Sequence, residues 1–449
     1  MRIKVKAVFD IGKTNKKFFL FDENFKEVYK VYAEFEEILD DDGHPSEDIR
    51  NLKKWALAVF DKALDDDHFE IESLNFSTYG ASFVHIGESG EVVGSLYNYT
   101  KKYDEALARR FYERYGPMED FCQQTASSNL GWLNSGLQLY WIKHLKSDLH
   151  QKIKYSLHLP QYLSYIFTGD FFSEYTSIGC HTGLWDYEKK DYHKWVYEEG
   201  IDHQLPEIVP TSTKVIKSFK GRQIVVGVGI HDSSAALIPY LWSSIKPFLL
   251  LSTGTWSIAL NPFSKDSLTK SELAEDCLFN MRMNGETVKA SRLFLGNEYK
   301  VQIKRLREHF GLEKGWDKEI KFSKSFFESI RKQKQKHFVW QSLKNKNDQQ
   351  LDLKNFRNKE EVYHQLMMEL VWLQAESIKT CLGNSEIKQV YVDGGFADNE
   401  VFIEILKYYF EEMAIRMANS PIGSALGAAI VISKDKLAKD FLERVYGLE

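Results

Sequence analysis

Several features that would mark a membrane or nucleic-acid-binding protein are missing from this chain of 449 residues. It contains no uninterrupted apolar run of the roughly 18 residues that a membrane-spanning helix needs. Its formal net charge of −5 gives no overall attraction to nucleic acid or to an anionic membrane. We therefore expect neither a membrane nor nucleic acid among its partners.

Cysteine is scarce, and the four cysteines do not form a local framework. Cys122, Cys180, Cys277 and Cys381 include no CxxC pair and no cluster, which indicates buried or free thiols in a reducing compartment. The N-terminal stretch MRIKVKAVFDIG enters a strand pattern without the apolar core or cleavage site of a signal peptide. We expect a cytoplasmic protein that is a monomer or a homodimer.

What the chain does contain is one pattern used twice. AVFDIGKTNKKFFLF (7–21) and FLLLSTGTWSIAL (248–260) each have strand, short turn and strand character. The hydrophobic content of 43% and the length predict two sizeable domains. We therefore predict a duplicated α/β protein with domains at 1–240 and 241–449 and a ligand-binding cleft between them.

Periodicity predicts the main elements of both halves. Helical spacing of apolar residues is found at 52–64, 137–145, 159–169 and 362–382, and strand patterns are found at 5–10, 17–21, 28–33, 74–77, 224–228 and 389–395. Residues 421–432 are small and apolar on all sides, as in a buried helix packed closely on a sheet. We interpret the polar stretch 314–361 as a solvated helical face, with aromatic residues between Phe322 and Trp340 available for an interface.

The turn after Asp10 permits two interpretations. Asp10 ends an apolar strand and is followed by Gly12-Lys13-Thr14-Asn15-Lys16. One interpretation is an ordinary hairpin with a turn-stabilising aspartate. The other is a phosphate cradle of backbone N–H groups, a hydroxyl and lysines, with the carboxylate holding Mg²⁺ through water. It is not a Walker loop, because no GxxxxGK[ST] pattern occurs.

Two further turns have the same ambiguity. Ser252-Thr253-Gly254-Thr255 lies in the second hairpin, and Gly394-Gly395 follows a strand. Each alone is also typical of an ordinary turn. Glycine permits close approach of the backbone to a ligand. Taken as a pair, the two hairpins would grip one nucleotide from both domains.

His231-Asp232 lies where a strand (224–228) gives way to a helix of small residues, SSAAL. Asp232 could cap that helix, a position that aspartate favours. Alternatively, at the mouth of the cleft, its carboxylate could accept a proton from a substrate hydroxyl as the oxygen attacks phosphorus.

DIGKTNK, HDSSAAL, LSTGTWS and VDGGFADN, in that order, resemble the FGGY carbohydrate kinases over nearly the whole chain. The resemblance implies two duplicated actin/Hsp70/hexokinase-like (ribonuclease H-like) α/β domains with an interdomain cleft. HD followed by STGTWS is similar to the rhamnulokinase and fuculokinase branch, as are STYGASF (77–83) and EYTSIG (174–179). That branch implies MgATP-dependent phosphorylation of a ketose, first a 6-deoxyhexulose such as L-rhamnulose or L-fuculose. Xylulose or another pentulose is the alternative.

The resemblance also implies roles for individual residues. Asp232 would be the general base, Gly80, Ser82 and His231 would contact the sugar, and Asp10 would organise Mg²⁺. Residues expected to line the ATP phosphates are Lys13, Thr14, Asn15, Lys16 and Lys17 from the first domain and Gly254 and Thr255 from the second. Gly394 and Gly395 would pack on the adenosine end. Ser82 stands where the branch usually has aspartate, which changes one partner of the sugar.

Two alternatives belong to other functional classes. One is an actin- or Hsp70-like ATPase switch without a sugar substrate, and the other is a non-catalytic sugar sensor. Switch proteins lack a base that faces a small-molecule pocket, so a base at Asp232 favours the kinase.

Overall fold

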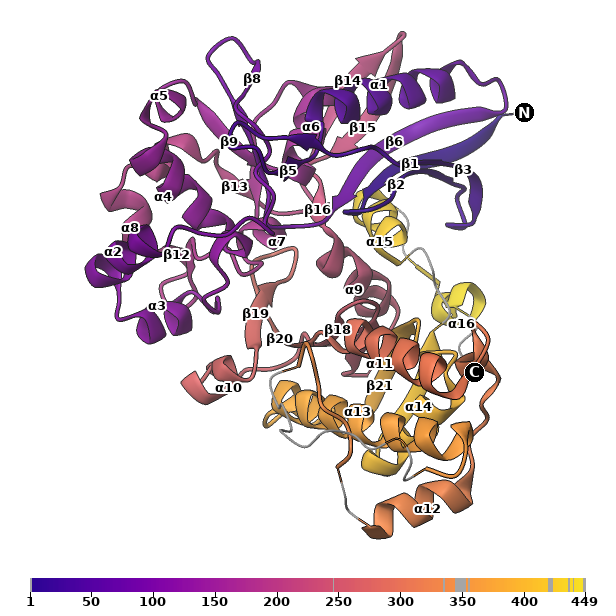
Figure 1. Cartoon of the computed structure of the whole chain (residues 1–449). Helices are drawn as coiled ribbons and strands as arrows, with labels where there is room; N and C mark the ends of the chain where they lie inside the picture. Colours follow the sequence, from indigo (N-terminus) through magenta and orange to yellow (C-terminus); the bar gives the residue numbers. More distant parts are fainter. Residues whose placement is uncertain are drawn as a thin grey trace.

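A computed structural model describes residues 2–244, 246–333, 336–343, 353, 356–418, 423–434, 437–438 and 440–446. Two sheets, each covered by helices, lie one above the other in Figure 1. Within the described residues, no helix is both long enough and apolar enough to cross a membrane.

The first sheet has the strand order β14-β15-β6-β1-β2-β3, and β16 also pairs with β6. β1 is antiparallel to β2 and parallel to β6. The central strands β1 and β6 are buried along most of their length because both faces of this sheet are covered. The bounds are β1 Ile3–Ile11, β2 Lys16–Phe21, β3 Glu27–Ala33, β6 Phe69–Thr78, β14 Lys214–Phe219, β15 Arg222–Gly227 and β16 Ile230–His231.

The second sheet repeats this plan with the order β19-β20-β18-β17-β21-β22. β17 is antiparallel to β18 and parallel to β21, as β1 is to β2 and β6. The predicted duplication is therefore confirmed at the level of strand pairing. The bounds are β17 Leu249–Thr253, β18 Ser257–Asn261, β19 Cys277–Met281, β20 Thr287–Leu293, β21 Gln389–Gly394 and β22 Ala414–Ala418.

Helices pack on both sheets. α1 (Ile49–Asp65) and α6 (Leu159–Thr168) contact β6 of the first sheet, and α13 (Lys359–Leu382) contacts β18 and β20 of the second. Each helix directs its apolar residues to the sheet, which buries two separate cores. The second core is completed by α11 (Leu295–Phe310), α12 (Lys324–Gln333) and α14 (Glu400–Tyr409).

Two helices cross between the halves. α15 (Gly423–Ile432), near the C-terminus, lies on the first sheet, where Asn75 of β6 donates a hydrogen bond to the Ala428 carbonyl at 2.8 Å. α9 (Asp232–Ser243) lies beside the second sheet, where the Tyr240 ring is 4.9 Å from that of Tyr391. Figure 1 shows yellow α15 next to the indigo strands. α9 and α15 thus each pack against the sheet of the other half.

Small residues allow α9 and α15 to approach closely. A Cβ atom added to Gly427 would lie 1.8 Å from the Ala235 carbonyl oxygen, so only glycine fits at this crossing. The prediction that 421–432 forms a buried helix is confirmed from Gly423 onward. Residues 421 and 422 lie outside the described residues.

A smaller layer of short elements is inserted between β6 and β14 and packs around its own aromatic core. It contains α7 (Tyr175–Ile178), which contacts β16 and β19 and so touches both halves. The other elements are β7 Phe83–Ile86, β8 Val92–Val93, α2 Glu105–Tyr115, α3 Met118–Gln124, α4 Ser135–Leu145, α5 Ser147–His150, β9 Tyr155–His158, β10 Ser173–Glu174, β11 Trp185–Asp186, β12 Asp191–Tyr192, α8 Lys194–Glu198 and β13 Ile208–Val209. Short pieces elsewhere are β4 Ile38–Leu39, β5 Pro45–Ser46, α10 Lys270–Ala274 and α16 Phe441–Tyr446, with 3₁₀ turns at Gly131–Leu133, Ile201–Gln204 and Trp316–Glu319.

The expected solvated helical face is present in α12, where Lys324, Arg331 and Lys332 are exposed. The expectation that the aromatic residues of this stretch are available for an interface is wrong. Trp316, Phe327, Phe338 and Trp340 are buried in the same core as α13. The loop at 341–342 is held by Glu298, whose carboxylate accepts hydrogen bonds from both backbone N–H groups at 3.0 and 2.7 Å. These aromatic residues therefore stabilise the second half and do not form a free interface.

Candidate active site between the two halves

The first hairpin turn presents a compact tip. The Gly12 N–H donates to the Asn15 carbonyl at 2.9 Å, and Thr14 and Asn15 are exposed. Lys13 lies beside the turn, with its ammonium 3.1 Å from Glu37 Oε1. This arrangement leaves backbone and hydroxyl donors at the tip free to meet an anion.

Lys16 does not face outward with the rest of the turn. Its ammonium donates to the carbonyls of Gly12 and Lys13 at 3.1 and 2.9 Å and forms a buried ion pair with Glu47. Three donors are all that an ammonium has. The predicted contact of Lys16 with phosphate therefore needs correction: Lys16 braces the turn from its buried side.

Asp10 lies at the end of β1, at the edge of the sheet where the carboxyl ends of β1 and β6 meet. Ser424 of α15 donates a hydrogen bond to Asp10 Oδ1 at 2.9 Å, and Lys17 Nζ lies 3.6 Å from Oδ2. Burial raises the pKa of Asp10, and the nearby charge of Asp232 raises it further. Carboxylate oxygen is a ligand that Mg²⁺ prefers, so the Asp10 side chain is chemically suited to hold a divalent cation.

Asp232 is the first residue of α9, and His231 occupies the cap position before it. The Asp232 carboxylate accepts hydrogen bonds from Ser233 N–H at 2.6 Å and from the Ser233 hydroxyl at 3.2 Å. A capping side chain would instead accept from the second or third N–H group of the helix. The interpretation of Asp232 as a cap is therefore wrong. Its side chain is 36% exposed, so a ligand can reach the carboxylate.

Gly80 and His231, predicted to contact the same sugar, are in contact with one another. A Cβ atom on Gly80 would lie 2.8 Å from His231 Nε2. The following residue, Ala81, has a φ of 59°, a left-handed conformation that non-glycine residues adopt mainly at constrained sites. Ser82 is buried, unlike Asp232.

The second hairpin is joined to the Gly394-Gly395 turn by Thr253, which sequence analysis did not single out. Its hydroxyl donates to the Asp393 carbonyl at 2.6 Å and accepts from Phe396 N–H at 3.0 Å. Gly394 has a φ of 88°, and a Cβ there would lie 1.9 Å from the Thr253 carbonyl oxygen. The two predicted nucleotide turns are therefore one connected structure.

The tip of the second hairpin is exposed backbone. Gly254 and Thr255 are both exposed, and the Thr255 carbonyl accepts from Asn297 N–H at 3.1 Å. Gly296 packs against this tip so closely that a Cβ would lie 1.8 Å from the Gly254 carbonyl oxygen. A pocket of about 580 Å³ beside the tip is lined by residues 128–130 of the first half and by Trp256, Arg292 and Phe294 of the second.

Two other residues near Asp10 and Asp232 were missed. Ser424 reaches Asp10 from the other half, and only its polarity at the start of an apolar helix distinguishes it in the sequence. Burial and then the charge of Asp232 raise the pKa of Tyr99, which therefore lies near the predicted base. No local pattern surrounds Tyr99.

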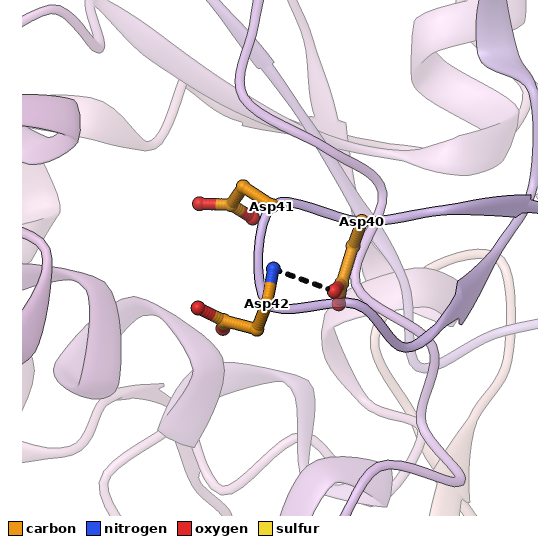
Figure 2. Close-up of side chains that lie close together, drawn as sticks. All are labelled: Asp40, Asp41 and Asp42. Carbon is orange, nitrogen blue, oxygen red and sulfur yellow. Dashed lines mark hydrogen bonds between the residues drawn. The ribbon is translucent and has the colours of Figure 1, made fainter.

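Asp40, Asp41 and Asp42 gather three carboxylates in one loop, as Figure 2 shows. Lys101 Nζ lies 3.0 Å from Asp40 Oδ2 and 2.6 Å from Asp42 Oδ2, and Lys146 Nζ lies 3.0 Å from Asp41 Oδ2. Two ammonium groups already neutralise most of this charge, so the loop is not a good metal site. The Asp42 N–H also donates to Asp40 Oδ1 at 2.9 Å.

Comparison with known families agrees with this geometry. Residues 5–238 match the N-terminal domain of the FGGY family of carbohydrate kinases, and residues 245–440 match the carbohydrate kinase FGGY C-terminal domain. The chain belongs to the FGGY family of carbohydrate kinases. Membership confirms the resemblance found in the sequence.

Individual relatives in the FGGY family are distant. A rhamnulokinase of Yersinia pestis (strain Pestoides F) is 26% identical over 218 residues, which cover 43% of this chain and 40% of the relative. A rhamnulokinase of Enterobacter sp. (strain 638) is 23% identical over 222 residues, which cover 46% of this chain and 43% of the relative. The chain thus aligns with less than half the length of these relatives.

Solved structures resemble the whole chain in fold. A carbohydrate kinase from Novosphingobium aromaticivorans has a TM-score of 0.77 at 22% identity, covering 95% of this chain and 93% of that one. A xylulose kinase from Lactobacillus acidophilus has a TM-score of 0.77 at 13% identity, covering 100% and 93%. The predicted two-domain α/β fold is confirmed.

Proposed function

We propose that this protein transfers the γ-phosphoryl group of ATP to a hydroxyl of a ketose, with a 6-deoxyhexulose such as L-rhamnulose or L-fuculose as the first candidate. The observation that carries the proposal is the arrangement of Asp10 and Asp232. Asp10 lies at the end of β1, just before the turn of the first hairpin, and an accessible Asp232 lies near enough for its charge to act on Asp10.

Asp232 supplies the proton acceptor. The sugar hydroxyl oxygen attacks the terminal phosphorus of ATP, the bond from that phosphorus to the bridging oxygen breaks, and ADP leaves. The hydroxyl proton passes to the Asp232 carboxylate. His231 and Gly80 line the same place and orient the sugar, which holds the attacking oxygen in position.

The two hairpins supply charge and backbone donors to the phosphates. Lys13 and Lys17 stabilise negative charge on the phosphates from the first half. The backbone N–H groups of Thr14 and Asn15 and the Thr14 hydroxyl add neutral donors. Gly254 and Thr255 contact the ATP phosphates from the second half. Gly394 and Gly395 pack against the adenosine end of ATP. Lys16 is left out of this set because its donors are used.

Asp10 is the residue that would hold Mg²⁺. The ion neutralises charge on the transferred phosphoryl group when bound. Among the described residues, Asp10 combines a buried carboxylate, a repelling neighbour at Asp232 and a position beside the phosphate hairpin.

A coupled assay of ADP release across rhamnulose, fuculose, xylulose and ribulose tests the proposal. We expect ketose-dependent turnover that is highest with a 6-deoxyhexulose. Preference for xylulose or ribulose would overturn the choice of sugar and support a pentulose kinase. Turnover that does not depend on sugar would overturn the kinase in favour of an ATPase switch. Ketose binding without ADP release would overturn it in favour of a sensor.

A further inference from the structure

The segment Glu174–Cys180 holds His231 by its backbone. The Glu174 carboxylate is fully buried and accepts hydrogen bonds from Thr176 N–H at 2.7 Å, Ser177 N–H at 2.6 Å and the Thr211 hydroxyl at 2.6 Å. The Thr176 hydroxyl donates to Glu174 at 2.7 Å and accepts from His231 N–H at 3.0 Å. A buried carboxylate is thereby linked through one hydroxyl to the residue beside Asp232.

The same segment holds His231 by its ring. Cys180 is buried, and its Sγ lies 3.4 Å from His231 Nε2. Asp232 Oδ1 lies 3.5 Å from the same nitrogen, and Gly80 leaves no space for a Cβ there. Because Nε2 faces both a sulfur and a carboxylate, which are hydrogen-bond acceptors, this nitrogen carries a proton whether the ring is neutral or charged.

The other ring nitrogen has a different environment. His231 is 95% buried, and among the described residues its Nδ1 has no hydrogen-bond partner. A buried polar atom without a partner is costly, so such an atom at a ligand site points to a contact with the ligand.

We propose that Cys180 is a positioning residue for the phosphoryl transfer: its sulfur pairs with His231 Nε2, fixes the ring against Gly80 and keeps both ring nitrogens protonated, so that Nδ1 donates to a sugar oxygen. The proposal rests on the proposed sugar kinase function. It assigns the sulfur no bond to the sugar, and Asp232 stays available as the proton acceptor.

The charges around the pair favour a thiolate beside an imidazolium. Burial alone would lower the pKa of His231, but the Cys180 sulfur and the Asp232 carboxylate raise it above its ordinary value. Burial opposes ionisation of Cys180, yet His181 and His231 lower the pKa of its thiol. The titratable or charged groups that face the pair from neighbouring elements are Glu174, Asp232, His158, His181 and Tyr187.

The remaining cysteines provide internal controls. Burial raises the pKa of the Cys122 and Cys277 thiols to about 12, and it raises that of Cys381 as well. Of the four cysteines, all described, Cys180 alone has a lowered thiol pKa and a histidine at contact distance. Cys122→Ser is therefore the matched control for Cys180→Ser.

The first test does not depend on activity. Thiolate absorbance in the ultraviolet is followed against pH for the intact chain and for the Cys180→Ser, His231→Gln and Cys122→Ser variants. We expect a thiolate signal at neutral pH in the wild type and in Cys122→Ser, its loss in Cys180→Ser, and a shift to higher pH in His231→Gln. An ordinary thiol titration near pH 8.5, or one unchanged by His231→Gln, would overturn the pairing.

The second test measures the effect on sugar binding. Cys180→Ser should raise the ketose KM about tenfold or more, the scale of a hydrogen bond to a charged group, and leave the ATP KM unchanged. The defect should grow as pH rises through neutrality, because His231 then loses its second proton earlier than in the wild type. An unaltered ketose KM at every pH would overturn the positioning role. If no ketose is phosphorylated, the absorbance test still decides the pairing, and Cys180→Ala replaces a serine variant that does not fold.

Discussion

The turns of the two hairpins occupy corresponding places in the two sheets but differ in charge. The first follows Asp10 and carries Lys13, Lys16 and Lys17, whereas the second, STGTWS (252–257), carries no charged residue. The first turn is closed by one backbone hydrogen bond and braced by a buried ion pair. The second is shaped by glycine contacts with Gly296 and Gly394. One half supplies charge to the site, and the other supplies backbone of a fixed shape.

The acidic residues at the strand ends also differ between the two halves. Asp10 of β1 is in register with Ser77 of β6, and in the second sheet Ser252 of β17 is in register with Asp393 of β21. Each half therefore pairs one carboxylate with one serine at this position of its sheet. The carboxylate is on the first strand of the pair in the first half and on the second strand of the pair in the second half. The Asp10 carboxylate of the first half lies near enough to Asp232 for the charge of Asp232 to raise its pKa. Duplication of a fold thus does not imply duplication of its chemistry.

The largest effect is expected at Asp232. Asp232→Asn should lower turnover about 10²–10⁴-fold, the usual contribution of a general base, because the amide cannot accept the hydroxyl proton. Thermal stability and ATP binding should stay as in the wild type. Steady-state ADP release measures the loss, with Asp61→Asn on the exposed face of α1 as the control. Near-normal turnover would contradict the assignment of Asp232 as the general base.

Lys16 tests whether all charges of the first hairpin act on phosphate. Lys16→Met should lower the free energy of unfolding by about 3–5 kcal/mol, the cost of leaving Glu47 as an unpaired buried charge. Denaturant titration measures this, and Lys26→Met on the exposed turn after β2 is the control. A variant of normal stability with a raised ATP KM would contradict the bracing role of Lys16 in the turn. It would indicate instead that Lys16 contacts the ATP phosphates.

Gly427 tests the crossing of α9 and α15. Gly427→Ala should destabilise the protein by about 1–3 kcal/mol, because the new Cβ meets the Ala235 backbone, even though alanine favours helix by about 1 kcal/mol. Gly395→Ala is the comparison, since its Cβ would enter open space. We expect Gly395→Ala to leave the melting temperature unchanged and to raise the ATP KM. Equal effects of the two variants on stability would argue against a tight crossing.

The smallest effects compare the two turns directly. Lys17→Gln should raise the ATP KM about tenfold, since charged hydrogen bonds contribute about 1.5–3 kcal/mol, and Thr255→Val should raise it about threefold through loss of a neutral one. Initial-rate kinetics at saturating ketose measure both, with Lys26→Gln as the control. A larger rise in the ATP KM for Thr255→Val than for Lys17→Gln would contradict the view that the charge of the first turn contributes more to ATP binding than the second turn does.

Periodicity and turn chemistry located the main elements well. The predicted helices at 52–64, 137–145 and 362–382 correspond to α1, α4 and α13, and the strand at 389–395 corresponds to β21. These segments bury one face or both faces, so their patterns are strong. The stretch 314–361 was misjudged because a few aromatic residues among many polar ones are enough to anchor it on α13. The average composition of a segment does not show whether a few of its residues are buried.

The site could be predicted only in part. The sequence by itself determined the two hairpins, the order of the motifs and the pair His231-Asp232, because turns and strand ends depend on neighbouring residues. Only the tertiary structure decided that Lys16 faces inward, that Ser424 reaches Asp10 and that Cys180 touches His231. Residues that are 51 and 414 positions apart form the last two contacts. Such contacts depend on how α7, α9 and α15 pack between the two sheets, and no local pattern in a chain encodes the direction in which a packed helix points a single side chain.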